Sequence, residues 1–234
     1  MYQQRQGFLS SLPPVTKNLI IINLLMWLAT IVLRKAMHID LIDYLGLHYI
    51  TAEKFNAAQF ATYMFLHDPT SIEHVFFNMF SVFMFGRTIE AVWGSRRFLI
   101  FYITTGLGAG LIQELTWFVT LHEGIAEAEA ALGVRQTSVM LNHIITIGAS
   151  GAVFGILLAF GMMFPNAELF LMFIPIPIKA KYFVVGYGVI ELLLGIHSHS
   201  GDNIAHFAHL GGMLFGLILI LYWRKKGRGN NGFY

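Results

Sequence analysis

A serine set among glycine and alanine is the first candidate for chemistry in this chain. Residues 148–155 read GASGAVFG, which places Ser150 at the expected start of an apolar helix. Backbone N–H groups at a helix start lack intrahelical acceptors, and together with the positive end of the helix dipole they suit a developing oxyanion. The pattern therefore fits a nucleophile beside part of an oxyanion hole, and it also fits plain helix packing through small residues.

A histidine near the C-terminus is the expected partner of this serine. Residues 203–216 read NIAHFAHLGGMLFG, in which His209 precedes a G-x-x-x-G pattern. The serine segment has the same glycine spacing, so the two glycine faces are expected to pack and bring His209 to Ser150. An imidazole about 3 Å from a serine hydroxyl can accept its proton. We therefore predict Ser150 as nucleophile and His209 as general base, with Phe154 stacked on the histidine ring.

Two more polar side chains share an apolar segment that begins HVFFN. His74 and Asn78 are four residues apart, so they project from one face of the expected helix. Both can donate hydrogen bonds, and both are costly in lipid without partners. Their spacing fits donors that complete an oxyanion site, and it fits a simple hydrogen bond between helices equally well. His206 precedes His209 by three residues and is expected to support packing or a cavity wall.

The composition places these residues in a membrane protein. Of 234 residues, 56% are hydrophobic and 12% are charged, which is about half the charged share of a soluble domain. A net charge of +2 gives no electrostatic footprint for nucleic acid, and the absence of cysteine excludes disulfides and thiolate chemistry. Six apolar stretches are long enough to span a membrane inside a bundle: 18–34, 74–93, 97–120, 147–164, 181–197 and 203–223.

The distribution of lysine and arginine sets the expected orientation. With both termini in the cytoplasm, the outer side holds only Arg34, Lys35, Lys54 and Arg135 of the 15 basic residues, as the positive-inside rule requires. We therefore expect a multi-pass protein of a bacterial cytoplasmic (inner) membrane. The first apolar run lacks a signal-peptide cleavage signature and is expected to remain as an anchor.

The connecting segments complete the expected architecture. Residues 35–73 are rich in aromatic side chains and are expected to form short helices in the outer interface. Residues 121–146 are expected to be an exposed outer loop with some helix, and residues 169–180 a cytoplasmic loop broken by prolines. Without internal repeats, the chain is expected to be one membrane domain, 1–234, with a cytoplasmic segment 1–17 and a basic tail 224–234.

The order of these elements resembles the rhomboid family of intramembrane proteases over nearly the whole chain. The matching stretches are TYMFLH, HVFFN, GRTIEAVWGSRRFLIFY, GASGAVFG and AHLGG. The resemblance implies an all-α, polytopic six-transmembrane-helix bundle with interfacial helices in the first outer loop. It also implies a Ser–His dyad without an aspartate, in a water-filled cavity open to the outer side. Such a dyad cleaves transmembrane segments of protein substrates through an acyl-enzyme, without metal or cofactor.

Carried over by motif, Ser150 would be the nucleophile and His209 the base. His74 and Asn78 would assist the oxyanion, and Gly148 would lie against the substrate in a strand-like stretch before the fourth span. Partners would be transmembrane-helix substrates and the lipid bilayer, with substrate entering between the second and fifth spans. The oligomeric state does not follow from the sequence.

One departure from the family pattern lies in the first outer loop. Where family members often carry a Trp-Arg pair, this chain has Ala58 and Gln59, which leaves the chemistry untouched but changes the interactions of that loop. Two carboxylates within spans, Glu114 and Glu191, have no role that the sequence assigns. We expect structural use for both, because a buried carboxylate needs partners.

Three other kinds of protein compete with this interpretation. A metal or haem protein would use the histidines that cluster near the C-terminus, namely His197, His199, His206 and His209, although no carboxylate–histidine spacing completes a site. A catalytically inactive relative would bind membrane helices without cutting them. A transporter or channel would need repeated broken helices, which the sequence lacks.

Overall fold

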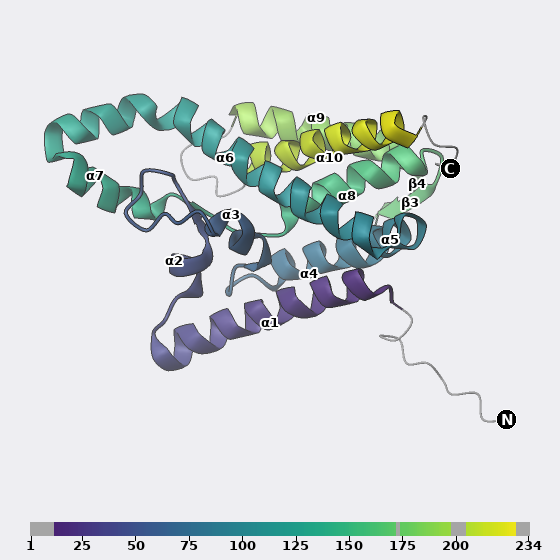
Figure 1. Cartoon of the computed structure of the whole chain (residues 1–234), viewed down its shortest axis with the longest axis horizontal. Coiled ribbons are helices and arrows are strands. Elements are labelled where there is room, and N and C mark those ends of the chain that lie inside the picture. The colour runs from purple at the N-terminus through teal and green to yellow at the C-terminus, as the bar shows by residue number, and fades with distance from the viewer. Residues whose placement is uncertain (1–11, 172–173, 198–204, 228–234) are drawn as a thin grey trace.

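Apolar helices make up most of the chain in the computed structural model, which describes residues 12–171, 174–197 and 205–227 (Figure 1). Five segments are long and apolar enough to cross a membrane: α1 (Pro14–Met37), the run from α4 to α5 (Ile72–Trp93), α6 (Ser95–Leu132), α9 (Ala180–His197) and α10 (His206–Gly227). A shorter apolar helix, α8 (Ser150–Met163), is the sixth. The predicted all-helical, multi-pass architecture is therefore confirmed.

The short helix α8 lies at the centre of the bundle. It contacts α4, α5, α6, α9 and α10, and most of its residues are buried. Its 14 residues cover only about 21 Å of axis, less than the hydrocarbon core of a bilayer. A helix that is apolar all round and enclosed by neighbours does not need full spanning length. The helix begins at Ser150, three residues after the predicted start of this span.

The second span is interrupted near its middle. Helix α4 (Ile72–Ser81) passes into one π-helical turn, η3 (Val82–Gly86), before α5 (Arg87–Trp93) continues. Such turns insert an extra residue into a helix and re-aim the side chains that follow. The span ends where Gly94 adopts a positive φ of 77°, a conformation that glycine tolerates.

Helix α6 is longer than predicted. It continues beyond residue 120, where the sequence placed the end of this span. It runs from Ser95 to Leu132 and extends beyond the rest of the bundle (Figure 1). The segment 126–132 reads AEAEAAL, in which every residue favours helix, so nothing ends the helix before Gly133, which has φ 85°. Helix α7 (Val134–Met140) then turns back toward the bundle.

The first outer connection contains the predicted short helices, α2 (Leu41–Leu45), α3 (Gln59–Thr62) and the 3₁₀ turn η2 (Tyr63–Phe65). The buried Gln59, one of the two departures from the family pattern, holds this connection together. Its Oε1 accepts from the backbone N–H groups of His48 and Asn56, both at 3.2 Å. Its Nε2 donates to the carbonyls of Tyr44 at 3.2 Å and Lys54 at 2.9 Å.

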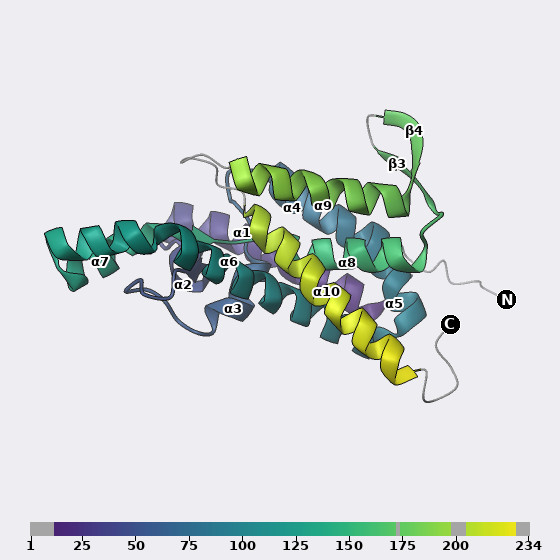
Figure 2. The same ribbon diagram turned by 90° about the horizontal axis from the view of Figure 1, so that it is seen from above.

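The connection between α8 and α9 is a β-hairpin rather than the predicted loop. Strand β3 (Glu168–Leu171) pairs antiparallel with β4 (Ile174–Lys179), with Glu168 opposite Lys179, and the hairpin projects from the bundle (Figure 2). Both strands of a two-stranded sheet are edge strands, where proline is tolerated. The prolines of β4 are therefore compatible with a strand.

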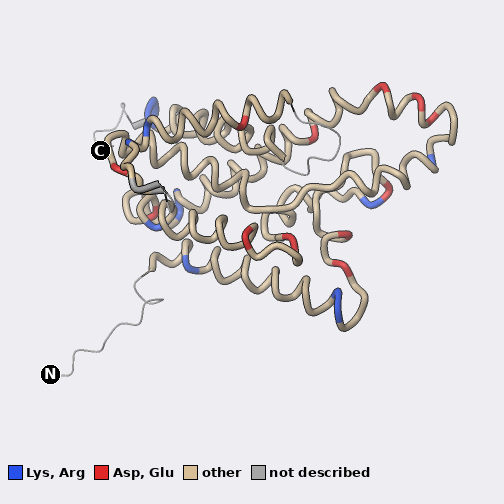
Figure 3. Tube along the Cα trace, turned by 180° about the vertical axis from the view of Figure 1, so that it is seen from behind, with Lys and Arg blue, Asp and Glu red and all other residues tan. Residues whose placement is uncertain are grey.

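Basic side chains gather at the end of the bundle where the described chain begins and stops (Figure 3). This end holds the start of α1, the turn between α5 and α6, the β-hairpin and the last turn of α10 with Arg224, Lys225 and Lys226. The opposite end holds α2, α3 and α7. The charge asymmetry predicted from the sequence is thus present in the folded chain.

A buried carboxylate fastens three helices together at this basic end. Glu90 of α5 accepts from the N–H groups of Val15 at 2.9 Å and Thr16 at 2.7 Å, which are unpaired donors in the first turn of α1. It also accepts from the hydroxyls of Thr16 and of Ser95, each at 2.7 Å. Glu90 therefore caps α1 from another helix and joins it to α5 and α6.

We predict that Glu90→Ala lowers the free energy of unfolding by at least about 2 kcal/mol, because two buried and two partly buried hydrogen bonds lose their charged acceptor. Thermal unfolding in detergent measures the effect, with the exposed Glu127→Ala on α6 as a matched control. Equal melting temperatures for the two variants would show that the hydrogen bonds of Glu90 do not stabilise the packing of α1 against α5 and α6.

Candidate active site

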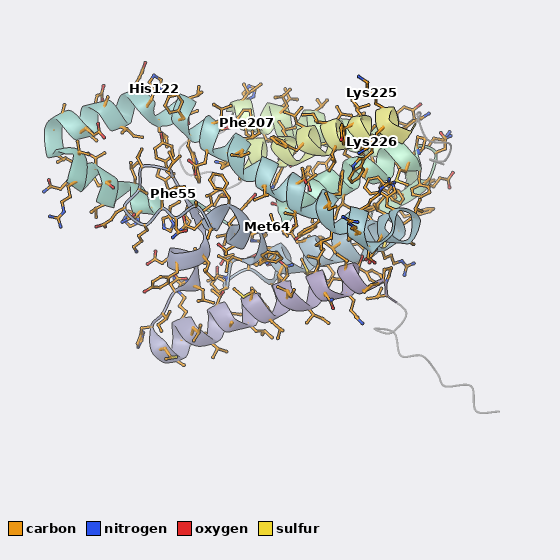
Figure 4. All side chains as sticks on the ribbon, viewed as in Figure 1. Phe55, Met64, His122, Phe207, Lys225 and Lys226 are labelled. Carbon is orange, nitrogen blue, oxygen red and sulfur yellow. The ribbon has the colours of Figure 1, made fainter. Side chains whose placement is uncertain are left out.

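The chain immediately before Ser150 is fixed by backbone pairing. Strand β1 (Leu47–His48) pairs antiparallel with β2 (Ile145–Thr146), and the N–H of Gly148 donates to the carbonyl of Tyr63 at 3.0 Å. The next residue of η2, Met64 (Figure 4), is fully buried against Gly106 of α6. The predicted strand-like stretch therefore exists, and it is anchored to the first outer connection.

Glycine brings the backbones of α8 and α10 into direct contact, as the sequence predicted. A Cβ placed on Gly212 would collide with the carbonyl oxygen of Gly151. One turn further along, a Cβ on Gly216 would stand 3.5 Å from the Cα of Gly155. The two G-x-x-x-G patterns therefore face each other, and no larger side chain fits between them at Gly212.

This contact brings Ser150 and His209 together. The Oγ of Ser150, the first residue of α8, lies 2.8 Å from Nε2 of His209. The ring of Phe154, one turn after Ser150, stacks on the imidazole with a centroid distance of 4.3 Å and an interplanar angle of 6°. Ser150 is half-buried and His209 is 9% exposed, so Ser150 is the more accessible residue of the pair.

Gly148 leaves open space beside the serine hydroxyl. It has a φ of 126°, which L side chains rarely adopt. A Cβ at this position would stand 2.9 Å from His74 Nε2 and 3.6 Å from Ser150 Oγ. Gly148 therefore keeps clear a small volume that is bordered by both of those polar atoms.

The orientation of the His74 ring makes Nε2 its donor nitrogen. The backbone N–H of Asp68 donates to Nδ1 of His74 over a long 3.4 Å, and a neutral imidazole that accepts at Nδ1 carries its proton on Nε2. His67 packs edge-on against the same ring at 5.0 Å. Burial lowers the pKa of His67 to about 3, so this neighbour stays neutral and adds no positive charge.

Asn78 is buried one turn along α4 from His74. Its Nδ2 donates to the carbonyl oxygen of His74 at 2.8 Å, which uses one of its two amide protons within its own helix. The structure therefore places Asn78 next to His74 on α4. Its predicted part in the oxyanion site stays a prediction.

The sequence assigned no partner to Glu191, and the structure gives it two. Its Oε2 lies 2.8 Å from Nδ1 of His209 and 2.7 Å from Nδ1 of His206. Glu191 belongs to α9 and both histidines to α10, so only the packing of these helices reveals the cluster. A signal was present in the sequence, because a carboxylate and a histidine in apolar spans need partners.

These three side chains are also the one group among the described residues whose ligand atoms gather closely enough for a metal ion. Two ligands of a tetrahedral ion at about 2.0–2.1 Å would be roughly 3.3 Å apart. The distances of 2.7 and 2.8 Å are those of direct hydrogen bonds. Of the other histidines in the competing metal interpretation, His197 contacts the Leu193 carbonyl at 2.9 Å, and His199 lies outside the described residues.

Comparison with known proteins identifies relatives of most of the chain. Residues 54–226 match the family model of the rhomboid domain. The chain is 30% identical over 165 residues to RHOMBOID-like protein 12, mitochondrial, of Arabidopsis thaliana, covering 67% of this chain and 44% of that protein. It is 25% identical over 158 residues to Rhomboid protein 1, mitochondrial, of Saccharomyces cerevisiae, covering 65% and 38%. The chain thus spans less than half the length of these two curated relatives.

We predict that Gly212→Ala lowers by about 100-fold the rate at which a serine-directed fluorophosphonate labels Ser150. The added methyl group forces α10 away from the Gly151 carbonyl, and a displacement of about 1 Å at reacting groups can cost that much. Gly124→Ala in α6 is the matched control, because nothing lies within 4 Å of a Cβ there. An unchanged labelling rate for Gly212→Ala would show that the glycine contact does not set the distance between Ser150 and His209.

Proposed function

The chain belongs to the rhomboid family, and we propose that it is an intramembrane serine endopeptidase that cleaves transmembrane segments of membrane proteins. The observation that carries the proposal is the 2.8 Å contact between Ser150 Oγ and His209 Nε2. Some rhomboid-like proteins are inactive, and the chemistry needs both a nucleophile and a base. This chain has both, at a distance that supports direct proton transfer.

In the proposed reaction, Ser150 Oγ attacks the carbonyl carbon of the scissile peptide bond while its proton passes to Nε2 of His209. The tetrahedral intermediate collapses when His209 gives that proton to the leaving amine, which leaves an acyl-enzyme. A water molecule then attacks the ester, with His209 again accepting and returning the proton. No metal or cofactor enters this scheme.

The negative charge of the intermediate would be held by donors on two elements. The backbone N–H of Ser150 lies in the first turn of α8, where N–H groups have no intrahelical acceptor. The Nε2–H of His74 faces the volume kept open by Gly148. His74 Nε2 and Ser150 Oγ border the same space, which supports the oxyanion role of His74 and the proposed contact of the substrate with Gly148.

Substrates would be helices that unwind easily. A helical segment hides its carbonyls in hydrogen bonds, so residues that weaken the helix near the scissile bond favour attack. We infer that substrates enter from lipid between α4 and α9, which pack on α8 from different sides. A Cβ placed on Gly186 would meet nothing within 4 Å, so there is space beside this part of α9, which supports its movement.

The orientation of the protein follows the charge distribution. We propose that the basic end of the bundle faces the cytoplasm, which puts the start of α1 and the end of α10 there and the Ser150 end of α8 near the outer side. We further propose a bacterial cytoplasmic membrane, although the relatives named above are mitochondrial proteins. The charge asymmetry is the property that supports this location.

The test of the proposal is cleavage of a model transmembrane substrate in liposomes. We predict that Ser150→Ala and His209→Ala each lower kcat by on the order of 10⁴-fold or more, while both proteins keep the wild-type melting temperature within a few degrees. Residual cleavage by Ser150→Ala at a tenth of the wild-type rate would rule out this serine as the nucleophile.

The lateral route has its own test, which the absence of cysteine makes simple. We predict that a cross-link between cysteines on the outer halves of α4 and α9 abolishes cleavage of a transmembrane substrate. A cross-link between α6 and α10, which already pack together, serves as the control and should leave cleavage intact. Full activity with α4 joined to α9 would show that substrate enters elsewhere.

A further inference from the structure

Glu191 is a buried carboxylate that no step of the proposed reaction uses. It is 4% exposed and belongs to α9, a helix whose other side chains are almost all apolar. An isolated carboxylate in such a place is costly unless donors surround it. Two donors are present, because Nδ1 of His206 and Nδ1 of His209 both lie within 2.8 Å of the same oxygen, Oε2.

This arrangement defines the protonation of the histidine ring. An ionised carboxylate can only accept hydrogen bonds, so each Nδ1 must carry a proton. Neutral His209 then has a bare Nε2, and it is Nε2 that lies 2.8 Å from the Ser150 hydroxyl. The bond to Glu191 therefore selects the tautomer in which His209 can accept the serine proton.

We propose that Glu191 is a positioning residue for His209. This chain then uses a triad of Ser150, His209 and Glu191 in place of the dyad that its resemblance to the rhomboid family implied. The inference rests on the proposed function, since it concerns the same base. When Nε2 takes the proton of Ser150, the ring becomes an imidazolium with protons on both nitrogens. The carboxylate then faces that positive charge directly, and no proton needs to move to Glu191.

His206 has a supporting part in this arrangement. It donates to the same Oε2 from the first turn of α10, and it is 4% exposed. The two histidines approach the oxygen from one helix, so they fix the carboxylate relative to α10 even though it belongs to α9. Phe154 stacks on one face of the His209 ring. The imidazole is thus restrained at its edge and on its ring face.

The test compares Glu191→Gln and Glu191→Asp with the wild type. Glutamine keeps the shape but loses the charge, and its NH₂ group can donate to Nδ1 and favour the wrong tautomer. We expect kcat to fall by at least about 100-fold with KM changed less than threefold, since replacing an orienting carboxylate by an amide in serine hydrolases costs up to ~10⁴-fold. Aspartate, which keeps the charge, should restore kcat to within about tenfold of wild type.

The matched control is Glu114→Gln in α6. Glu114 is a buried carboxylate that accepts from the N–H of Ile50 at 3.0 Å, a bond that the glutamine carbonyl can also accept. It should leave kcat within about twofold of wild type. The rate at which a fluorophosphonate labels Ser150 gives a second readout, because labelling depends on the base and not on unwinding a substrate helix. Glu191→Gln should lower this rate in parallel with kcat.

The outcomes separate the two proposals. A wild-type protein that neither cleaves nor becomes labelled overturns the proposed function and this inference with it. A wild type that does both, with Glu191→Gln equal to it in kcat and labelling rate, overturns the inference alone. If Glu191→Gln does not fold, ¹⁵N NMR of the histidine rings in the wild type decides. A protonated Nδ1 and a bare Nε2 on His209 support the positioning role of Glu191, and the reverse tautomer refutes it.

Discussion

The close approach of α8 and α10 is the constraint on which the rest of the structure depends. In lipid, helices gain little by hiding apolar surface from each other, so contact must come from packing and polar pairs. Glycine at 212 lets one backbone rest on the carbonyl of Gly151. Because Ser150 and His209 precede these glycines on their helices, the contact that packs the bundle also sets the distance between Ser150 and His209.

The polar side chains inside the bundle show how the helices around this contact are held. Glu90 gathers four donors at the basic end and fixes α1 against α5 and α6. Glu191 gathers two histidines near the start of α10 and ties α9 to it. Each carboxylate therefore joins different helices of the bundle. If α9 moves to admit a substrate, Glu191 moves with it, so access to the site and alignment of its base depend on one helix.

Much of this arrangement could be predicted from the sequence, because lipid restricts what each residue type can do. The apolar runs gave the spans, and the shared glycine spacing gave the contact between Ser150 and His209. The end of α6 was missed because its polar extension still favours helix up to Gly133. The strands β3 and β4 were missed because proline suggested a loop. Glu191 stayed without partners because its spacing from His206 and His209 reflects the packing of two helices, which no local pattern records.

The identity of the nucleophile is the central claim, and the site of covalent capture tests it most directly. Protein treated with a fluorophosphonate, digested and sequenced by mass spectrometry should carry one adduct, on the oxygen of Ser150. His209→Ala should lose that adduct, since the hydroxyl would then have no base 2.8 Å away. An adduct on any other residue, or labelling of Ser150 that is unchanged in His209→Ala, would contradict the account.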